Sequence, residues 1–379
     1  MSAKLRLLEP MEVGSLRAAS FAEALRVHAN FDSKRVKKSL AEIKEWGQKL
    51  KIKHKDCGAL KKLIQNPEQS ERWHDKAIRL SLVLPVRFFQ EAGLRVYSPS
   101  GEWHLVKGDM YQWEIHQIKG ITLGNDYVRS FDDRIWLPGI IEDPIKLAHA
   151  FPNDEVNIAV KYAQKGDILK FAFSGALTQI FWSMNEYYKD VQEAVLAYAK
   201  EVLRPNIKDM IKRGASLIQI DEPQAHQLGA KLCAEAFNVA TKGIKGEFYL
   251  HMCFGKYREE IFPEIMEAKN CELFTLELSN GDPWEVNAAH TGYDFLKDFA
   301  QYNDGRAIGV GLFDIHNPKV ESKELQQKRL ETAIKNLGDP KYAFPFPDCG
   351  GRQLHPFDSY LPKLKNMVAA ADRVRSQYE

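Results

Sequence analysis

The sequence predicts an α/β protein built as a single (β/α)8 barrel (a TIM barrel) over residues 1–379, with long insertions after the first and second strands. Eight short apolar runs rich in strand-forming residues recur along the chain, and longer stretches of helical pattern separate them. This alternation is typical of parallel βα units, and eight units favour a closed barrel over an open sheet. The length of 379 residues also suits one such barrel.

The eight runs define the expected strands in order. They are MEVGS (11–15), LRVYS (94–98), ILKFAFS (168–174), SLIQID (216–221), EFYLHMC (247–253), LFTLEL (273–278), AIGVGLFDIH (307–316) and YAFPFPDC (342–349). The stretches between them have helical patterns, and the one over 190–214 ends on a glycine, as helices commonly do.

Two segments interrupt this alternation. Residues 33–63 are lysine-rich and helical in pattern. They fit either a solvated helix face, which is the commoner case, or a surface for an anionic partner. Residues 103–150 form an irregular insertion after the second run. In a barrel this insertion would lie over the C-terminal mouth, where loops shape substrate sites.

Composition and charge narrow the classes of function. The chain has 44% hydrophobic and 27% charged residues, which is typical of a globular protein with a sizeable core, and its formal net charge is only +2. No overall field therefore favours nucleic acid or a membrane surface. The N-terminal residues lack the apolar core of a signal peptide, and no apolar run is long enough to cross a bilayer. We expect a cytoplasmic protein that binds neither nucleic acid nor membranes.

Reactive side chains gather where the predicted strands end. In a (β/α)8 barrel these ends meet at one mouth, which is where barrel enzymes carry out their chemistry. The residues at these ends that we single out are Ser15, Glu102, Asp221, His251, Cys253, Glu277, His316 and Cys349.

His251 and Cys253 are two residues apart in one strand, so their side chains point to the same side. Taken singly, each is more often a packed core residue than a ligand. Cys349 lies in a turn-rich PDCGG segment, and Glu277 ends the strand after His251. Together they form a His/Cys/Glu/Cys set of nitrogen, sulfur and oxygen donors that suits catalytic zinc.

The other cysteines and the remaining polar residues have simpler interpretations. Cys57 and Cys233 lie in helical patterns and Cys271 precedes its strand, so all three are predicted to be structural. Asp221, in IQIDEP, is either part of an acidic pair at a helix N-terminus or a carboxylate that holds a substrate ammonium. His316 is either an ordinary strand-end histidine or a general acid.

Several motifs, read together, resemble the C-terminal catalytic barrel of cobalamin-independent methionine synthase, in the superfamily that also contains uroporphyrinogen decarboxylase. These motifs are VGSL, AGLRVYSPSGE, LKFAFSGALTQIFWS, IQIDEP, HMCFG, LELSNGD, GVGLFDIHNPKVES and PDCGG, in that order along nearly the whole chain.

The resemblance implies a role for each of the singled-out residues. His251, Cys253, Glu277 and Cys349 would bind Zn²⁺, which would also take up the substrate thiol. Asp221 and Glu102 would bind the amino group of homocysteine, Ser15 would contact its carboxylate, and His316 would be the acid that assists methyl transfer.

The predicted function is therefore a zinc-dependent thiol alkyltransferase, with methyl transfer to homocysteine and methionine as product. The full-length synthase has an N-terminal half for which this chain has no room, so the methyl donor is a folate, a methylcorrinoid or a partner protein. One alternative is an enzyme like epoxyalkane:coenzyme M transferase, in which Lys107, Arg129 or Arg352 would bind the sulfonate of coenzyme M. An alternative of another class is a non-catalytic zinc-binding relative.

Overall fold

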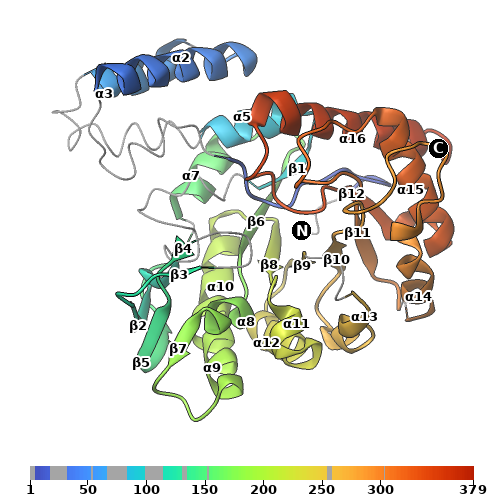
Figure 1. Cartoon of the computed structure of the whole chain (residues 1–379). Helices are drawn as coiled ribbons and strands as arrows, with labels where there is room; N and C mark the ends of the chain where they lie inside the picture. The colour runs from blue at the N-terminus through green and yellow to red at the C-terminus, as the bar shows by residue number, and fades with distance from the viewer. Residues whose placement is uncertain are drawn as a thin grey trace.

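The computed structural model of the chain describes residues 5–17, 32–52, 54–65, 83–98, 114–129, 135–151, 153–253, 258–302 and 304–379. A sheet of seven parallel strands lies at the centre, with helices outside it (Figure 1). In spatial order the strands are β1 (Val96–Tyr97), β6 (Ile168–Ser174), β8 (Leu217–Asp221), β9 (Glu247–Met252), β10 (Leu273–Leu276), β11 (Ala307–Gly311) and β12 (Ala343–Phe346).

Residues 11–16 close this sheet into a ring. Met11 forms a parallel bridge with Val96 of β1, and its main-chain N–H donates to the carbonyl of Pro345 in β12 at 2.9 Å. Leu16 forms a parallel bridge with Gly351, beyond the end of β12. All eight predicted runs thus take part in the barrel in sequence order, which confirms the predicted fold class.

The first run differs from the prediction because it forms isolated bridges instead of a regular strand. The main-chain N–H of Ser98 donates to the carboxylate of Glu12. The side chains of Lys170 and Gln219 donate to the main-chain carbonyl of Val13 at 2.8 and 2.7 Å. Side chains therefore form hydrogen bonds with main-chain groups that would bond to a neighbouring strand in a regular parallel sheet. The predicted run 307–316 is also shorter than expected, since β11 ends at Gly311.

The helices around the barrel follow the predicted alternation. The pattern over 190–214 forms two α-helices joined by a π-helical turn at Ala199–Leu203, and it ends at Gly214, which has a left-handed φ of 111°. The helices on the barrel are α5 (Val83–Glu91), α7 (Asn153–Tyr162), α8 (Ala176–Phe181), α9 (Val191–Tyr198), α10 (Arg204–Arg213), α11 (Ala225–Leu228), α12 (Ala230–Thr241), α13 (Arg258–Ile261), α14 (Phe295–Tyr302), α15 (Lys323–Leu337) and α16 (Leu361–Arg375). Shorter 3-10 or π turns lie at Glu264–Glu267, Thr291–Tyr293, Pro340–Tyr342 and Pro356–Tyr360.

The interior of the barrel changes character along the strands. Toward their N-terminal ends it is an apolar cluster that includes Val96, Leu217, Tyr249 and Leu273. Because alternate residues of a strand point to the same side, Gln219 and Asp221 continue the inward row that starts at Leu217. The polar inward positions thus lie toward the C-terminal ends, where the site was predicted.

The lysine-rich segment forms two helices, α2 (Ser33–Lys49) and α3 (His54–Gln65). α2 buries Ile43 and Trp46, and the Trp46 ring lies 4.6 Å from the ring of Phe357 in the turn that precedes α16. Its lysines at 34, 37, 38 and 44 are exposed on the opposite side of the helix. This arrangement is that of an amphipathic helix with a solvated charged face.

The second insertion adds a small sheet beside the barrel. β2 (Ile118–Leu123), β5 (Gly139–Leu147) and β7 (Ser183–Asn185) form three strands, and β3 (Val128–Arg129) pairs with β4 (Ile135–Trp136). Figure 1 shows the three-stranded sheet next to α9 and α10. Residues 103–113 and 130–134 of the predicted insertion lie outside the described residues. Glu114, which follows the first of these two ranges, accepts hydrogen bonds from Ser174 N and Gln179 Nε2, at 3.2 and 2.6 Å, at the C-terminal end of β6.

None of the helices described is both long and apolar enough to cross a membrane.

Candidate metal centre and substrate site

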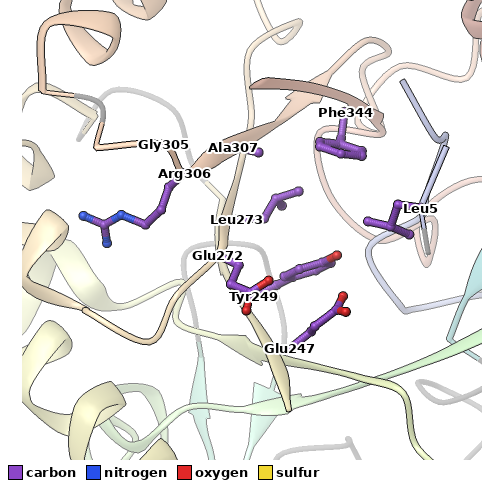
Figure 2. Close-up of a pocket in the computed structure, with 9 residues that line it drawn as sticks. All are labelled: Leu5, Glu247, Tyr249, Glu272, Leu273, Gly305, Arg306, Ala307 and Phe344. Carbon is purple, nitrogen blue, oxygen red and sulfur yellow. The ribbon is translucent and has the colours of Figure 1, made fainter. Parts of the chain in front are cut away.

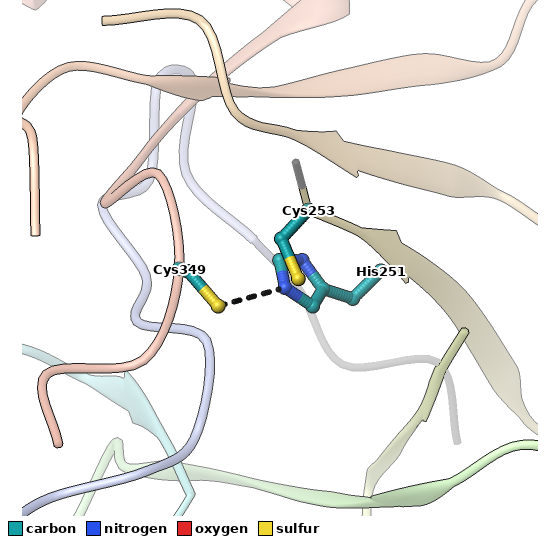
Figure 3. A group of neighbouring side chains, drawn as sticks. All are labelled: His251, Cys253 and Cys349. Atoms are coloured by element: carbon teal, nitrogen blue, oxygen red, sulfur yellow. Dashed lines mark hydrogen bonds between the residues drawn. The ribbon is translucent and has the colours of Figure 1, made fainter. Parts of the chain in front are cut away.

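Three predicted ligands converge at the C-terminal mouth. His251 lies near the end of β9, Cys253 follows that strand, and Cys349 follows β12. One ligand atom from each lies within 4.8 Å of the others, and His251 Nε2 is 3.4 Å from Cys349 Sγ. Figure 3 shows the sulfurs of Cys253 and Cys349 beside the imidazole ring. Two sulfur donors and one imidazole nitrogen fit a zinc ion.

The His251 ring is oriented by the neighbouring strand. Thr275 pairs in register with His251, and its Oγ1 lies 2.6 Å from His251 Nδ1. If Nδ1 carries the ring proton and donates it to Thr275, the Nε2 lone pair faces the two cysteines. Metal-binding histidines are commonly held through their other nitrogen in this way.

The two cysteines differ in how readily they ionise. A hydrogen bond from Cys253, followed by the charge and hydrogen bond of His251, holds the pKa of Cys349 well below its usual value despite burial. That same hydrogen bond, together with burial, raises the pKa of Cys253 well above its usual value. Cys349 is therefore the thiol that ionises first, and thiolates are the form that ligates metals.

The structure brings Glu277 near the three ligands without including it among them. Its carboxylate follows β10 and is buried, but the group of atoms within 4.8 Å of one another consists of His251, Cys253 and Cys349. Glu277 Oε1 accepts a hydrogen bond from Asn280 Nδ2 at 2.6 Å and lies 3.6 Å from His316 Nε2. Its role as fourth ligand stays a prediction.

His316 faces the same site from the loop after β11. The Glu277 carboxylate raises the pKa of His316 to about 9, against the opposing effect of partial burial. His316 Nδ1 lies 3.2 Å from Gln353 Oε1, on the connection after Cys349. The ring is therefore protonated at neutral pH, and 33% of its side chain is exposed.

A buried ion pair supports the loop that carries His316, and sequence reasoning missed it. Lys363 Nζ in α16 lies 2.7 Å from Glu321 Oε2, and both side chains are fully buried. Glu321 Oε1 accepts from the main-chain N–H of Asp314 at 3.0 Å, and Asp314 Oδ1 accepts from the N–H of His316 at 2.7 Å. The two charges are 42 positions apart in the sequence, so no local motif contains this pair.

Asp348 is a second residue that sequence reasoning missed. Its carboxylate is fully buried and accepts from the N–H groups of Leu278 and Ser279, both at 2.9 Å, and from Ser279 Oγ at 2.6 Å. It thereby ties the Cys349 segment to the residues after Glu277. Asp348 is the aspartate of the PDC motif, next to Cys349, and this motif was the signal that could have revealed it.

The predicted substrate contacts lie beside the ligands where they are described. Asp221 ends β8 and pairs in register with His251. Burial raises its pKa to about 6, so the carboxylate is ionised at neutral pH. Ser15 packs against Gly350, the residue after Cys349. A Cβ atom added to Gly350 would lie only 1.9 Å from Ser15 Oγ. Glu102 and Lys107 lie outside the described residues.

Glu222, next to Asp221, has a structural role. Its carboxylate accepts from the N–H groups of Leu177 and Thr178 at 3.0 and 2.9 Å, and from Thr178 Oγ1 at 2.8 Å. It therefore caps the N-terminus of α8. The helix-terminus interpretation of the acidic pair thus holds for Glu222, while Asp221 faces the barrel interior.

A separate cavity opens at the other end of the barrel. It has a volume of about 360 Å³ and lies where β9, β10, β11 and β12 begin, lined in part by Glu247, Tyr249, Glu272 and Arg306 (Figure 2). Burial, and then the charge of Glu247, raise the pKa of Glu272. The cavity is separated from the metal centre by the length of the strands, so it is not part of that site.

Comparisons with known proteins agree with this arrangement. Residues 64–373 match the family described as the catalytic domain of cobalamin-independent synthase. A methionine synthase of Thermoplasma acidophilum is 31% identical over 306 residues, covering 75% of this chain and 88% of the relative. A methionine synthase of Pyrococcus furiosus is 29% identical over 324 residues, covering 84% of this chain and 88% of the relative.

A longer relative and a solved structure extend the comparison. The 5-methyltetrahydropteroyltriglutamate–homocysteine methyltransferase of Thermosynechococcus vestitus is 27% identical over 328 residues, which are 83% of this chain and 40% of that protein. A B12-independent methionine synthase from Shewanella sp. W3-18-1, solved with selenomethionine, superposes with a TM-score of 0.73 at 19% identity, covering 98% of this chain and 99% of the other. At this identity the superposition establishes the fold alone.

Proposed function

The chain belongs to the catalytic-domain family of cobalamin-independent synthases, a family of methyltransferases, and from this premise we propose that it transfers a methyl group to the sulfur of homocysteine and forms methionine. The observation that carries this proposal is the convergence of His251, Cys253 and Cys349 beside the ionised carboxylate of Asp221. A thiol-activating centre next to an ammonium-binding group suits a substrate that is both a thiol and an amino acid.

We propose that His251, Cys253 and Cys349 hold zinc, with Glu277 as the fourth ligand. The donor set supports this choice, because two cysteine sulfurs and an imidazole favour zinc over the oxygen-preferring ions. Bound there, zinc would keep a substrate thiol in its nucleophilic thiolate form at neutral pH. The position of Glu277, next to the three ligands and held by Asn280, is compatible with a ligand that yields its place to the substrate.

The chain's own residues would position the substrate and handle the proton. Asp221 would bind the ammonium of homocysteine through a charge-assisted hydrogen bond, and Ser15 would contact the carboxylate. Glu102 is proposed as a second contact of the ammonium. His316, protonated at neutral pH, would donate its Nε2 proton to the leaving atom of the methyl donor.

The experiment that tests this function uses the purified chain loaded with zinc. We expect methionine to form from homocysteine with a methyltetrahydropteroyltriglutamate or with methylcobalamin as donor, measured by mass spectrometry. Coenzyme M, offered in place of homocysteine, should give no methylated product. Absence of methionine with both donors, or zinc coordination that added homocysteine leaves unchanged in X-ray absorption, would contradict the proposal and favour a non-catalytic zinc protein.

Thr275 offers a test of the metal centre that does not depend on activity. We expect Thr275→Val to weaken zinc affinity by about 10–100-fold, the usual effect of losing the group that orients a metal-binding histidine. The measurement is competition with a chromophoric chelator. The matched control is Thr241→Val, a buried threonine of α12 whose Oγ1 donates to Phe237 O at 2.8 Å. Equal zinc affinity in the two variants would show that Thr275 does not orient a ligand.

A further inference from the structure

Lys170 is a lysine buried inside the barrel. It lies in β6 with no exposed surface, and its Nζ donates to three acceptors. These are the main-chain carbonyl of Glu12, that of Val13 at 2.8 Å, and Gln219 Oε1 at 2.5 Å. An ammonium has three N–H donors, so these acceptors match its hydrogens.

Gln219 links Lys170 to the proposed substrate site. Because Gln219 Oε1 accepts from Lys170, the orientation of the amide is fixed, and Nε2 is left to donate to other groups. Gln219 Nε2 donates to Val13 O and to Asp221 Oδ1, each at 2.7 Å. The two side chains therefore hold both the carboxylate proposed to bind the ammonium and Val13, which precedes Gly14 and Ser15.

Stability alone gives little reason for this arrangement. Burying a lysine and an amide is costly unless each polar group is paired, and apolar side chains such as Leu217 and Tyr249 fill the adjacent layer of the barrel. Burial lowers the pKa of Lys170, while the charges of Glu12 and Asp221 raise it. The paired polar groups therefore indicate that this network serves to hold particular groups in place.

We propose that Lys170 and Gln219 are positioning residues that fix Asp221 relative to the segment of Gly14 and Ser15, and that they thereby select thiols carrying an α-ammonium and an α-carboxylate. This inference rests on the proposed function, because it assigns the two groups to the two ends of an amino-acid head. The reacting sulfur would bind elsewhere, at the proposed ligands His251, Cys253 and Cys349. Loss of the pair should therefore affect recognition of the head and leave the chemical step intact.

The test compares homocysteine with 1-propanethiol, which matches homocysteine from the sulfur to the α-carbon and lacks its ammonium and carboxylate. For Gln219→Met we expect KM for homocysteine to rise about 10–100-fold, as for loss of a hydrogen bond to a buried charge, with kcat within about threefold. The kcat/KM for 1-propanethiol should also stay within about threefold, so the preference for homocysteine falls by at least tenfold. Lys170→Met should also raise KM for homocysteine. In the double variant Lys170→Met/Gln219→Met, the loss of homocysteine binding free energy should be smaller than the sum of the two single losses.

Two further variants keep the test decisive. Gln219→Glu retains an acceptor for Lys170 but places an oxygen against Asp221 Oδ1, so it should also raise KM for homocysteine. It replaces Gln219→Met in the test if Gln219→Met does not fold. Asn206→Leu is the matched control, since the side chain of buried Asn206 in α10 bonds the main chain of Phe151, at 2.7 and 2.8 Å, far from the substrate site. It should lower the melting temperature without changing the preference between the two thiols.

The outcomes separate this inference from the proposed function. An unchanged preference in Gln219→Met, or equal losses for both thiols, would overturn the positioning role. If the wild-type chain forms no methionine, the proposed function fails, but calorimetric binding of homocysteine to the zinc-loaded protein still tests the inference. Wild-type affinity for homocysteine in Gln219→Met would then overturn it, and weaker affinity with unchanged zinc content would support it.

Discussion

Cys349→Ser is expected to lose bound zinc and to reduce methionine formation by at least about a thousandfold, well beyond the 10–100-fold typical of changes outside the ligand shell. Cys349 Sγ is one of three donor atoms within 4.8 Å of one another. Its pKa is held well below the usual value, chiefly by the hydrogen bond from Cys253, so it is the thiol best prepared to ligate. A serine hydroxyl stays protonated at neutral pH and is a poor zinc ligand. The measurements are zinc per chain after dialysis, and kcat with homocysteine.

Cys271→Ser is the matched control for this prediction. Cys271 is buried, its Sγ bonds the carbonyl of Leu273 at 3.2 Å, and burial raises its pKa to about 12. This thiol lies outside the ligand group, so Cys271→Ser should keep both zinc and activity. If Cys349→Ser retained a full equivalent of zinc, the metal would have to bind elsewhere, and the proposed centre would be wrong.

The barrel could be predicted from the sequence because its strands are apolar runs in a regular rhythm. Periodicity did not predict the irregular pairing of the first run. There, the carboxylate of Glu12 accepts from Ser98 N, and Lys170 and Gln219 donate to Val13 O. Such side-chain bonds join segments more than 80 residues apart, as between Glu12 and Ser98, and no local pattern contains them.

The convergence of His251, Cys253 and Cys349 could be predicted for a similar reason. His251 and Cys253 are two residues apart at the end of one strand, so their spacing alone places them together, and Cys349 follows from the closed order of the strands. The supports of the site are different. Lys170 and Gln219 each appear as one polar residue in an apolar run. Only the fold shows that they meet at Val13 and that Gln219 reaches Asp221.

The second large effect is expected at His316. We expect His316→Asn to lower kcat by about 10²–10⁴-fold, the range for loss of a general acid, with zinc content and KM for homocysteine nearly unchanged. Glu277 raises the pKa of His316 to about 9, so the acid is present at neutral pH and is lost as the pH rises through that value. Wild-type kcat should therefore fall on the alkaline side, and the variant should lack this fall. The measurement is kcat from pH 6 to 10.

The methyl donor provides the sharpest control for His316. A tetrahydrofolate leaves through nitrogen, which needs a proton, whereas methylcobalamin leaves as a cobalt(I) species, which needs none. The penalty of His316→Asn should thus be large with the folate donor and small with methylcobalamin. His355→Asn removes another partly exposed histidine, on the connection after Cys349, where its ring is paired with Asp358 at 3.1 Å, and it should change neither rate. Equal penalties with both donors would mean that His316 acts through Glu277 and the metal centre instead of donating a proton.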